Sequence, residues 1–242
     1  MKPFLLLTTR EHDQAAEQEY TSTMRISGLG RDAMKQMRIE REPMGRLNLR
    51  DWSGIILGGS GFNASEPHKS DVQLRLEAEL ADLLDEVIDK DFPFLGMCYG
   101  VGVLTQYLGG TVDHTYAEDV GAVEITLTEA GQADPLLEGI PASFWAFVGH
   151  KEAARELPEG ATLLGTGEVS PVQLFRVESN IYATQFHPEL DVDDLITRMR
   201  IYQHAGYFDP SELDDLAAAA KASPVDGTQH RILRNFVAQH SR

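Results

Sequence analysis

Three residues in two short segments could together perform nucleophilic catalysis. Cys98, the only cysteine, stands in the sequence Gly-Met-Cys-Tyr-Gly, after an apolar run at residues 92–95 and before a helical pattern that ends at residues 109–110. A strand that turns directly into a helix, with a reactive side chain at the bend, is typical of a nucleophile elbow. Because the positive end of the helix favours the thiolate, we expect Cys98 to be the nucleophile.

A general base is offered by the segment Gln-Phe-His-Pro-Glu, which follows a short apolar strand pattern and contains His187 and Glu189. Pro188 favours an extended backbone at His187, and residues two apart in an extended segment point the same way. Glu189 could therefore hold one ring nitrogen of His187 and leave the other to accept the thiol proton. A histidine at a strand end is often only structural, but its combination with the elbow favours a Cys98–His187–Glu189 triad.

An oxyanion hole needs two backbone donors close to the nucleophile. The amide of Tyr99, directly after Cys98, is one candidate by elbow geometry. The other is the amide of Gly59 in the sequence Gly-Gly-Ser-Gly, which we interpret as a turn after a strand. Rigid donors aimed at developing negative charge contribute strongly to catalysis. An ordinary turn is the alternative interpretation, and the segment lacks the Lys-Ser/Thr of a phosphate-binding loop.

The remaining candidates concern what the site would hold. Gly149 and His150 follow an apolar strand pattern, and Ser170 precedes another. Each could line a substrate pocket, although a structural role is the simpler interpretation. The histidines and the single cysteine show none of the spacings typical of a metal site. We therefore predict no metal ion and no cofactor.

Composition restricts the kind of protein and its partners. The chain has 242 residues, of which 42% are hydrophobic, and a formal net charge of −17. Such an acidic chain is unsuited to nucleic acid or to an anionic membrane surface. A single cysteine fits a reducing compartment, and no apolar run approaches the roughly 20 residues of a membrane span. We expect a cytoplasmic protein that binds neither nucleic acid nor membrane.

The order of patterns along the chain predicts an α/β fold. Apolar strand patterns alternate with helical ones over the first 110 residues: strands at 4–8, 35–40, 51–58 and 92–95, helices at 11–26 and 70–88. This alternation predicts a parallel sheet covered by helices on both faces. Short strand patterns between residues 120 and 186 predict a small, partly antiparallel region, and helical patterns follow residue 191. We expect one domain over residues 1–242, with residues 210–242 as a helical appendage.

The two catalytic segments together resemble those of class I glutamine amidotransferases. Phe-Leu-Gly-Met-Cys-Tyr-Gly and Gln-Phe-His-Pro-Glu occur in the family's order, and Ile-Ile-Leu-Gly-Gly-Ser-Gly precedes them. The likeness is greatest to the glutaminase domains of GMP synthases. The resemblance implies a flavodoxin-like three-layer sandwich with a mostly parallel central sheet. It also implies that Cys98 attacks a γ-carboxamide and forms a γ-glutamyl thioester. In this scheme His187 would transfer the protons and Glu189 would orient His187. The amides of Gly59 and Tyr99 would hold the oxyanion.

Two positions depart from the family's pattern. Gly102 stands where the family usually has a glutamine that contacts the substrate, and Gly149-His150 replaces the family's Ser-His pair. Both changes remove polar side chains, so we expect a wider site with a weaker grip on glutamine. A site that lacks such a hydrogen-bonding group discriminates less well.

Three functions remain open at this point. The first is a glutaminase that releases ammonia from glutamine for a separate synthetase or acceptor subunit. The second is a γ-glutamyl hydrolase or peptidase that acts on another γ-glutamyl compound, as Gly102 and Gly149 would favour. The third is a non-catalytic regulatory module on the same fold, which the presence of Cys98, His187 and Glu189 disfavours.

Overall fold

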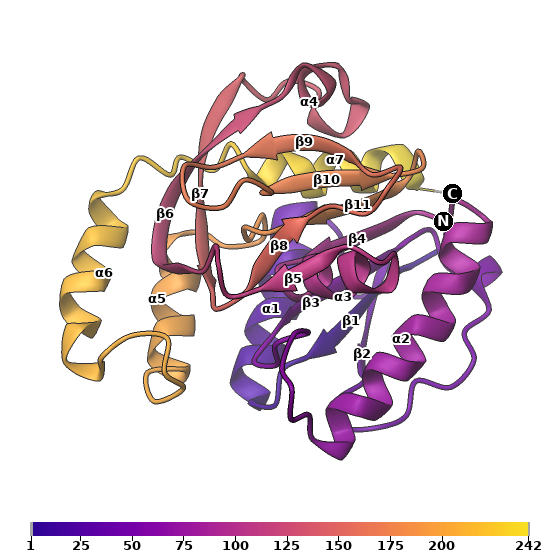
Figure 1. Ribbon diagram of the computed structural model, residues 1–242, viewed down its shortest axis with the longest axis horizontal. Helices are drawn as coiled ribbons and strands as arrows, with labels where there is room; N and C mark the ends of the chain where they lie inside the picture. Colours follow the sequence, from indigo (N-terminus) through magenta and orange to yellow (C-terminus); the bar gives the residue numbers. More distant parts are fainter. Residues whose placement is uncertain (1, 242) are drawn as a thin grey trace.

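The computed structural model describes residues 2–241, and nine of the strands within that range form one sheet (Figure 1). The order of strands across it is β2-β1-β3-β4-β11-β10-β9-β6-β7. These strands are β1 (Phe4–Thr9), β2 (Met34–Arg38), β3 (Ile55–Ser60), β4 (Phe94–Met97), β6 (Glu118–Leu127), β7 (Ser143–His150), β9 (Thr162–Thr166), β10 (Leu174–Val177) and β11 (Ile181–Thr184). Two short strands, β5 (Thr111–Asp113) and β8 (Ala153–Glu156), pair separately.

One half of the sheet is parallel, as the alternation of strands and helices predicts. Strands β2, β1, β3, β4 and β11 all run in the same direction. Residues of β1, β3, β4 and β11 are buried on both faces, which is typical of a sheet with helices on either side. The carboxyl ends of these four strands therefore meet at one edge, where ligands bind in such sheets. The comparison with flavodoxin itself stays a prediction.

The antiparallel strands, expected as a small region, extend this same sheet. Strand β10 pairs antiparallel with β11 and β9, and β6 pairs antiparallel with β9 and β7. The short strands β5 and β8 and the helix α4 (Glu129–Ala133) were not predicted. These elements are too short for a periodic pattern to stand out.

Helices cover the two faces of the sheet and form three layers. Helix α1 (Asp13–Ser27) and helix α7 (His230–His240) lie on one face; α2 (Asp71–Asp89) and α3 (Tyr99–Tyr107) lie on the other. In β1 the side chains alternate accordingly, with Leu5 and Leu7 in the core beneath α2 and α3, and Phe4 and Leu6 in the core beneath α1 and α7. Among the described residues, no helix has the length and apolarity needed to span a membrane.

The segment after residue 190 belongs to the fold in two different ways. Helices α5 (Val192–Ile201) and α6 (Leu213–Ala222) pack together in a third apolar cluster beside β6 and β7, where Phe147 is fully buried. Helix α7 instead returns to the main core (Figure 1), and Phe236 on it packs against Phe4 with ring centroids 6.0 Å apart. Helix α7 thus contributes to the main core and α6 to the third cluster, and the division of residues 210–242 from the rest of the domain stays a prediction.

The packing of α7 predicts the effect of truncating its largest core side chain. Phe236→Ala should lower the free energy of unfolding by about 3–5 kcal/mol, because the fully buried ring leaves a cavity that the sheet cannot close. Urea denaturation measures this loss. In a matched control, Leu74→Ala on α2 should change stability by less than about 0.5 kcal/mol, because Leu74 is 55% exposed. A loss below about 1 kcal/mol for the Phe236 variant would show that α7 is dispensable.

Candidate active site

Cys98 stands at the sharp turn between β4 and α3. Its backbone has φ 54° and ψ −87°, a conformation that a residue with a side chain adopts only under strain. The crossing of strand and helix is equally tight, because a Cβ at Gly96 would lie 2.9 Å from the Gly100 Cα. Only glycine at position 96 fits this approach without a shift of the backbone. The strand, the sharp turn and the helix are arranged as expected, and the role of Cys98 as a nucleophile stays a prediction.

His187 and Glu189 follow β11 and lie side by side, as the extended Pro188 segment predicts. The His187 Nδ1 is 2.8 Å from the Glu189 Oε1, and both side chains are buried. Since a carboxylate accepts hydrogen bonds, Nδ1 carries the proton, which leaves Nε2 as the basic atom. Arg198, on α5, donates from Nη1 to the same Glu189 oxygen at 2.9 Å. The negative charge of Glu189 is thus shared between the imidazole and a guanidinium.

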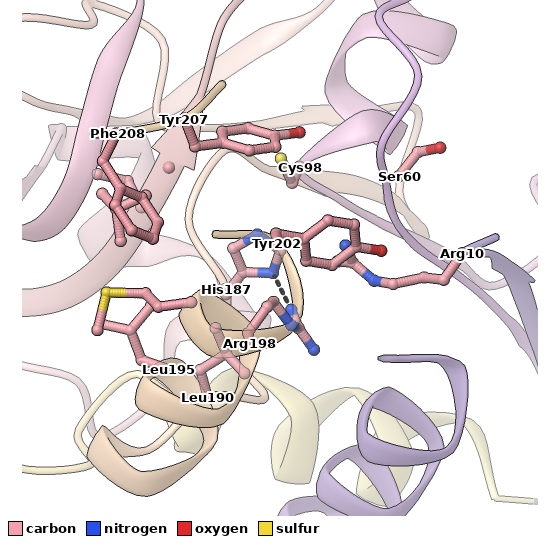
Figure 2. Close-up of a pocket in the computed structure, with 14 residues that line it drawn as sticks. Arg10, Ser60, Cys98, His187, Leu190, Leu195, Arg198, Tyr202, Tyr207 and Phe208 are labelled. Atoms are coloured by element: carbon pink, nitrogen blue, oxygen red, sulfur yellow. Dashed lines mark hydrogen bonds between the residues drawn. The ribbon is translucent and has the colours of Figure 1, made fainter. Parts of the chain in front are cut away.

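Cys98 and His187 line one cavity, which Figure 2 shows beneath the segment after α5. Within residues 2–241 no hydrogen bond joins the thiol to the imidazole; the Cys98 Sγ lies 4.0 Å from the Gln185 Nε2. In unliganded enzymes such bonds are often long and form only with substrate. Both partners come from strand ends that meet at the same edge of the parallel sheet.

Burial controls the protonation of both residues. It raises the pKa of the Cys98 thiol to about 12, although the Arg10 guanidinium acts in the opposite direction. Burial also lowers the pKa of His187, despite the nearby Glu189 carboxylate. The thiol and the imidazole are therefore both neutral at pH 7. Desolvation of the thiol thus acts against the thiolate that the helix end is expected to favour, and the charge of Cys98 at rest stays a prediction.

The two predicted oxyanion donors differ in their present partners. The Tyr99 amide opens α3, and the first N–H groups of a helix have no acceptor within it. The Gly59 amide donates instead to the Glu19 Oε1 at 3.1 Å. Gly59 also belongs to β3 rather than to a turn, since the strand continues to Ser60. Its role as an oxyanion donor stays a prediction that requires the bond to Glu19 to break.

Gly102 lies on α3, and the space next to it is occupied by the carboxylate of Glu152, which directly precedes β8. A Cβ at this position would lie 3.0 Å from the Glu152 Oε1 and 2.9 Å from the Ala64 Cβ. Glu152 accepts hydrogen bonds from the amides of Ala64 (2.5 Å) and Ser65 (2.7 Å). The expectation that Gly102 widens the site is wrong, because Glu152 fills the space and holds the adjoining loop.

The other substrate candidates fall in different places. Gly149 lines the cavity that Cys98 and His187 line, as well as a second cavity that Cys98 also lines. His150 lines only the second, and its two ring nitrogens lie 2.9 Å from the Glu152 carbonyl and 2.8 Å from the Glu118 carboxylate. Ser170 lines neither cavity and donates to the Val172 carbonyl at 3.3 Å. Substrate contact by any of the three stays a prediction.

Sequence reasoning missed several residues of the site. Arg10 follows β1 directly, and a charged residue at the carboxyl end of a buried strand is a signal that could have found it. Its side chain is buried and pairs with Glu19 through Nε at 2.9 Å. Arg198 lies in an ordinary amphipathic helix, and Tyr207 in an irregular segment. Neither has a local pattern that marks it. The part of the chain that the structure describes holds no cluster of side chains suited to a metal ion.

A family model described as glutamine amidotransferase class-I matches residues 35–197. The chain belongs to this family. The match includes Cys98, His187 and Glu189 and ends before the last residues of α5.

Individual relatives agree with this membership. The sequence is 36% identical to the GMP synthase [glutamine-hydrolyzing] of Streptomyces coelicolor over 115 residues. These residues are 47% of this chain and 22% of that protein. It is 30% identical to that of Petrotoga mobilis over 148 residues, which are 60% of this chain and 26% of that protein. The chain thus spans about a quarter, or less, of the length of these curated relatives.

Solved structures share the fold over almost the whole chain. A glutamine amidotransferase from Thermotoga maritima has a TM-score of 0.77 at 20% identity, with 99% of this chain and 98% of that one covered. A protein from Thermoplasma acidophilum, described as one subunit of a GMP synthase, has a TM-score of 0.62 at 20% identity, with 98% and 94% covered. At these identities the likeness concerns the fold.

The contact between Gly102 and Glu152 predicts the outcome of restoring the family's glutamine. Gly102→Gln should destabilise the protein by about 1–3 kcal/mol, because the new side chain meets Ala64 and Glu152 in a filled space. Urea denaturation of a double-mutant cycle checks this: the same substitution should cost less in a Glu152→Ala background. Equal costs in both backgrounds would contradict the steric account.

Proposed function

We propose that this protein hydrolyses a γ-carboxamide, with glutamine as the reference substrate, through Cys98, His187 and Glu189. The observation that carries the proposal is the buried His187–Glu189 hydrogen bond of 2.8 Å beside the cavity that also contains Cys98. Such an arrangement of nucleophile, base and orienting acid is a general device for acyl transfer. Membership of the class I glutamine amidotransferase family supports the same chemistry.

The steps follow from the protonation states of the buried groups. Substrate binding brings the carboxamide carbon to the Cys98 sulfur, and the His187 Nε2 takes the thiol proton as the C–S bond forms. The Tyr99 amide donates to the oxyanion. The imidazolium then gives its proton to the amide nitrogen, so that the C–N bond breaks and ammonia leaves from a γ-glutamyl thioester. His187 next removes a proton from water, which attacks the thioester and releases glutamate and the thiol.

Glu189 keeps its charge throughout this cycle. The buried His187 and Arg198 next to it hold the pKa of the carboxyl far below its usual range, although burial alone would raise it. The carboxylate therefore stabilises the imidazolium that forms during attack, without itself accepting a proton. Arg198 acts as a positioning residue, because its Nη1 lies 2.9 Å from the Glu189 Oε1 and 3.3 Å from the His187 Nδ1, away from the Nε2 that takes the proton.

The destination of the ammonia is also a proposal. The curated relatives are named GMP synthase [glutamine-hydrolyzing], and one solved neighbour is named as a subunit of such a synthase. By analogy, we propose that a separate synthetase or acceptor subunit uses the ammonia released here. Such a reaction would place the protein in the reducing cytoplasm, in agreement with its single cysteine.

A glutaminase assay with trapping of the intermediate tests the proposal. The purified protein should release glutamate from glutamine, and Cys98→Ala should lower the rate by at least about a thousandfold. Acid quenching followed by mass measurement should find one γ-glutamyl group on the peptide that contains Cys98.

The control for this assay is Val169→Ala, which alters a side chain that is 51% exposed and lines neither cavity. It should retain full activity. Glutamate release that survives Cys98→Ala, or an acyl group on another residue, would refute the proposed nucleophile. Failure of Cys98 to react with glutamine and with a diazoketone analogue of glutamine would favour the non-catalytic alternative.

A further inference from the structure

Cys98 lines two cavities of different chemistry. The first has a volume of about 50 Å³ and is lined by His187; the second has a volume of about 20 Å³. Both are lined by Cys98, Ser60, Gly149 and Tyr207. We call them the imidazole cavity and the polar cavity. A substrate bound for attack by the thiol would extend into both.

The polar cavity suits the glutamyl part of a substrate. Lys151, Glu152 and Gln185 line it with a cation, an anion and an amide. The Gln185 Oε1 is buried and accepts no hydrogen bond from any residue that the structure describes. Gly102 also lines it. Charged groups of both signs and an unused acceptor match the carboxylate and ammonium of a γ-glutamyl group.

The imidazole cavity lies where the leaving group must depart. A general acid protonates the leaving nitrogen directly, so that nitrogen must come within hydrogen-bond reach of the imidazole. His187 lines the imidazole cavity and does not line the polar one. The position of the His187 ring therefore assigns the leaving amine to the imidazole cavity and the acyl group to the polar cavity.

The walls of the imidazole cavity are mostly apolar, which Figure 2 shows around His187. The apolar and aromatic residues of the lining are Val120, Val148, Leu190, Leu195, Met199, Tyr202, Tyr207 and Phe208. Ammonia is polar and gains nothing from such walls. An alkyl or aromatic group would gain about fourfold in binding for each buried methylene, by the usual free energy of transfer.

A segment outside the family match completes this cavity. Tyr202, Tyr207 and Phe208 follow residue 197, where that match ends. Tyr207 reaches over Cys98 (Figure 2), and Lys151 holds the segment by donating to the Ala205 carbonyl at 2.9 Å and by lying 4.5 Å from the Tyr207 ring centroid. The apolar wall is therefore built in part by residues that lie beyond the region matched by the family model.

We infer that the preferred substrate is a γ-glutamyl amide whose leaving group is an apolar primary amine. This inference rests on the proposed function and replaces ammonia by a larger amine in the same steps. The thiol proton passes through the His187 Nε2 to the amide nitrogen, the C–N bond breaks, and the amine leaves through the imidazole cavity. Water then releases glutamate from the Cys98 thioester.

An apolar amine could come from two sources, and Arg10 distinguishes them. It could be the C-terminal amino acid of a γ-glutamyl dipeptide or an alkylamine without a carboxylate. The Arg10 guanidinium lines the imidazole cavity, and Glu19 holds it through Nε. The carboxylate of an amino acid leaving group would find a cation there, whereas a simple alkylamine would not use it.

Two matched substrate series test the inference. In one, γ-glutamyl-glycine is compared with γ-glutamyl-leucine; in the other, γ-glutamyl-methylamide is compared with γ-glutamyl-isoamylamide. In at least one series, kcat/KM should rise by about tenfold or more with the larger group. A rise among the dipeptides alone assigns the amine to an amino acid, and a rise among the alkylamides assigns it to a simple amine. A flat or falling response in both series would overturn the inference.

Val120→Phe places a larger side chain in the wall of the imidazole cavity and should remove this preference. The ratio of kcat/KM values within the responsive series should fall to about one. Leu216→Ala on α6 is the control, because Leu216 packs in the same apolar cluster and does not line the cavity. It should leave the ratio unchanged. An undiminished ratio in a folded Val120 variant would place the amine elsewhere and overturn the inference.

A separate measurement distinguishes this inference from the proposed function. A diazoketone analogue of glutamine carries no amine leaving group and labels a competent nucleophile directly. Labelling of Cys98 together with a flat substrate series would refute the apolar amine alone. No labelling, and no glutamate from any substrate, would refute the proposed function itself.

Discussion

The buried carboxylate of Glu189 is the group on which the arrangement of this site depends. It is completely excluded from solvent and has two charged or polarisable partners, the His187 Nδ1 at 2.8 Å and the Arg198 Nη1 at 2.9 Å. An isolated buried charge is costly, and it persists only where such partners compensate for lost hydration. The same contacts fix the tautomer of His187 and tie α5 to the end of β11. The fold and the chemistry therefore share one electrostatic constraint.

A second consequence of burial is that the site is uncharged at the atoms that react. Desolvation raises the pKa of Cys98 and lowers that of His187, so the proton stays on sulfur until a substrate arrives. A neutral thiol is protected from oxidation and from chance electrophiles, because the thiolate is the reactive form. In the proposed cycle, proton transfer to His187 is coupled to attack, and Glu189 stabilises the cation that results. The sulfur is carried by the strained turn at Cys98, where φ is 54°.

The sequence allows the local parts of the site to be predicted, and the structure explains why. Cys98 and the neighbouring glycines specify the turn within a few residues, and Pro188 places Glu189 beside His187 by extended geometry alone. Contacts between distant segments could not be inferred in this way. Arg198 reaches Glu189 from α5, and Glu152 lies next to Gly102 from the segment between β7 and β8. Gly59 was assigned to a turn because glycine favours turns, but pairing with β1 extends β3 through it.

The ionisation of Cys98 is the most direct test of this account. Because the chain has one cysteine, the ultraviolet absorbance of the thiolate, taken as the difference between the protein and its Cys98→Ser variant, reports on that residue alone. The account predicts no thiolate signal from about pH 7 to about pH 10, well beyond the pKa of about 8.5 for a free cysteine. A full thiolate signal at about pH 7 would contradict it, because it would mean that Cys98 and His187 form an ion pair at rest.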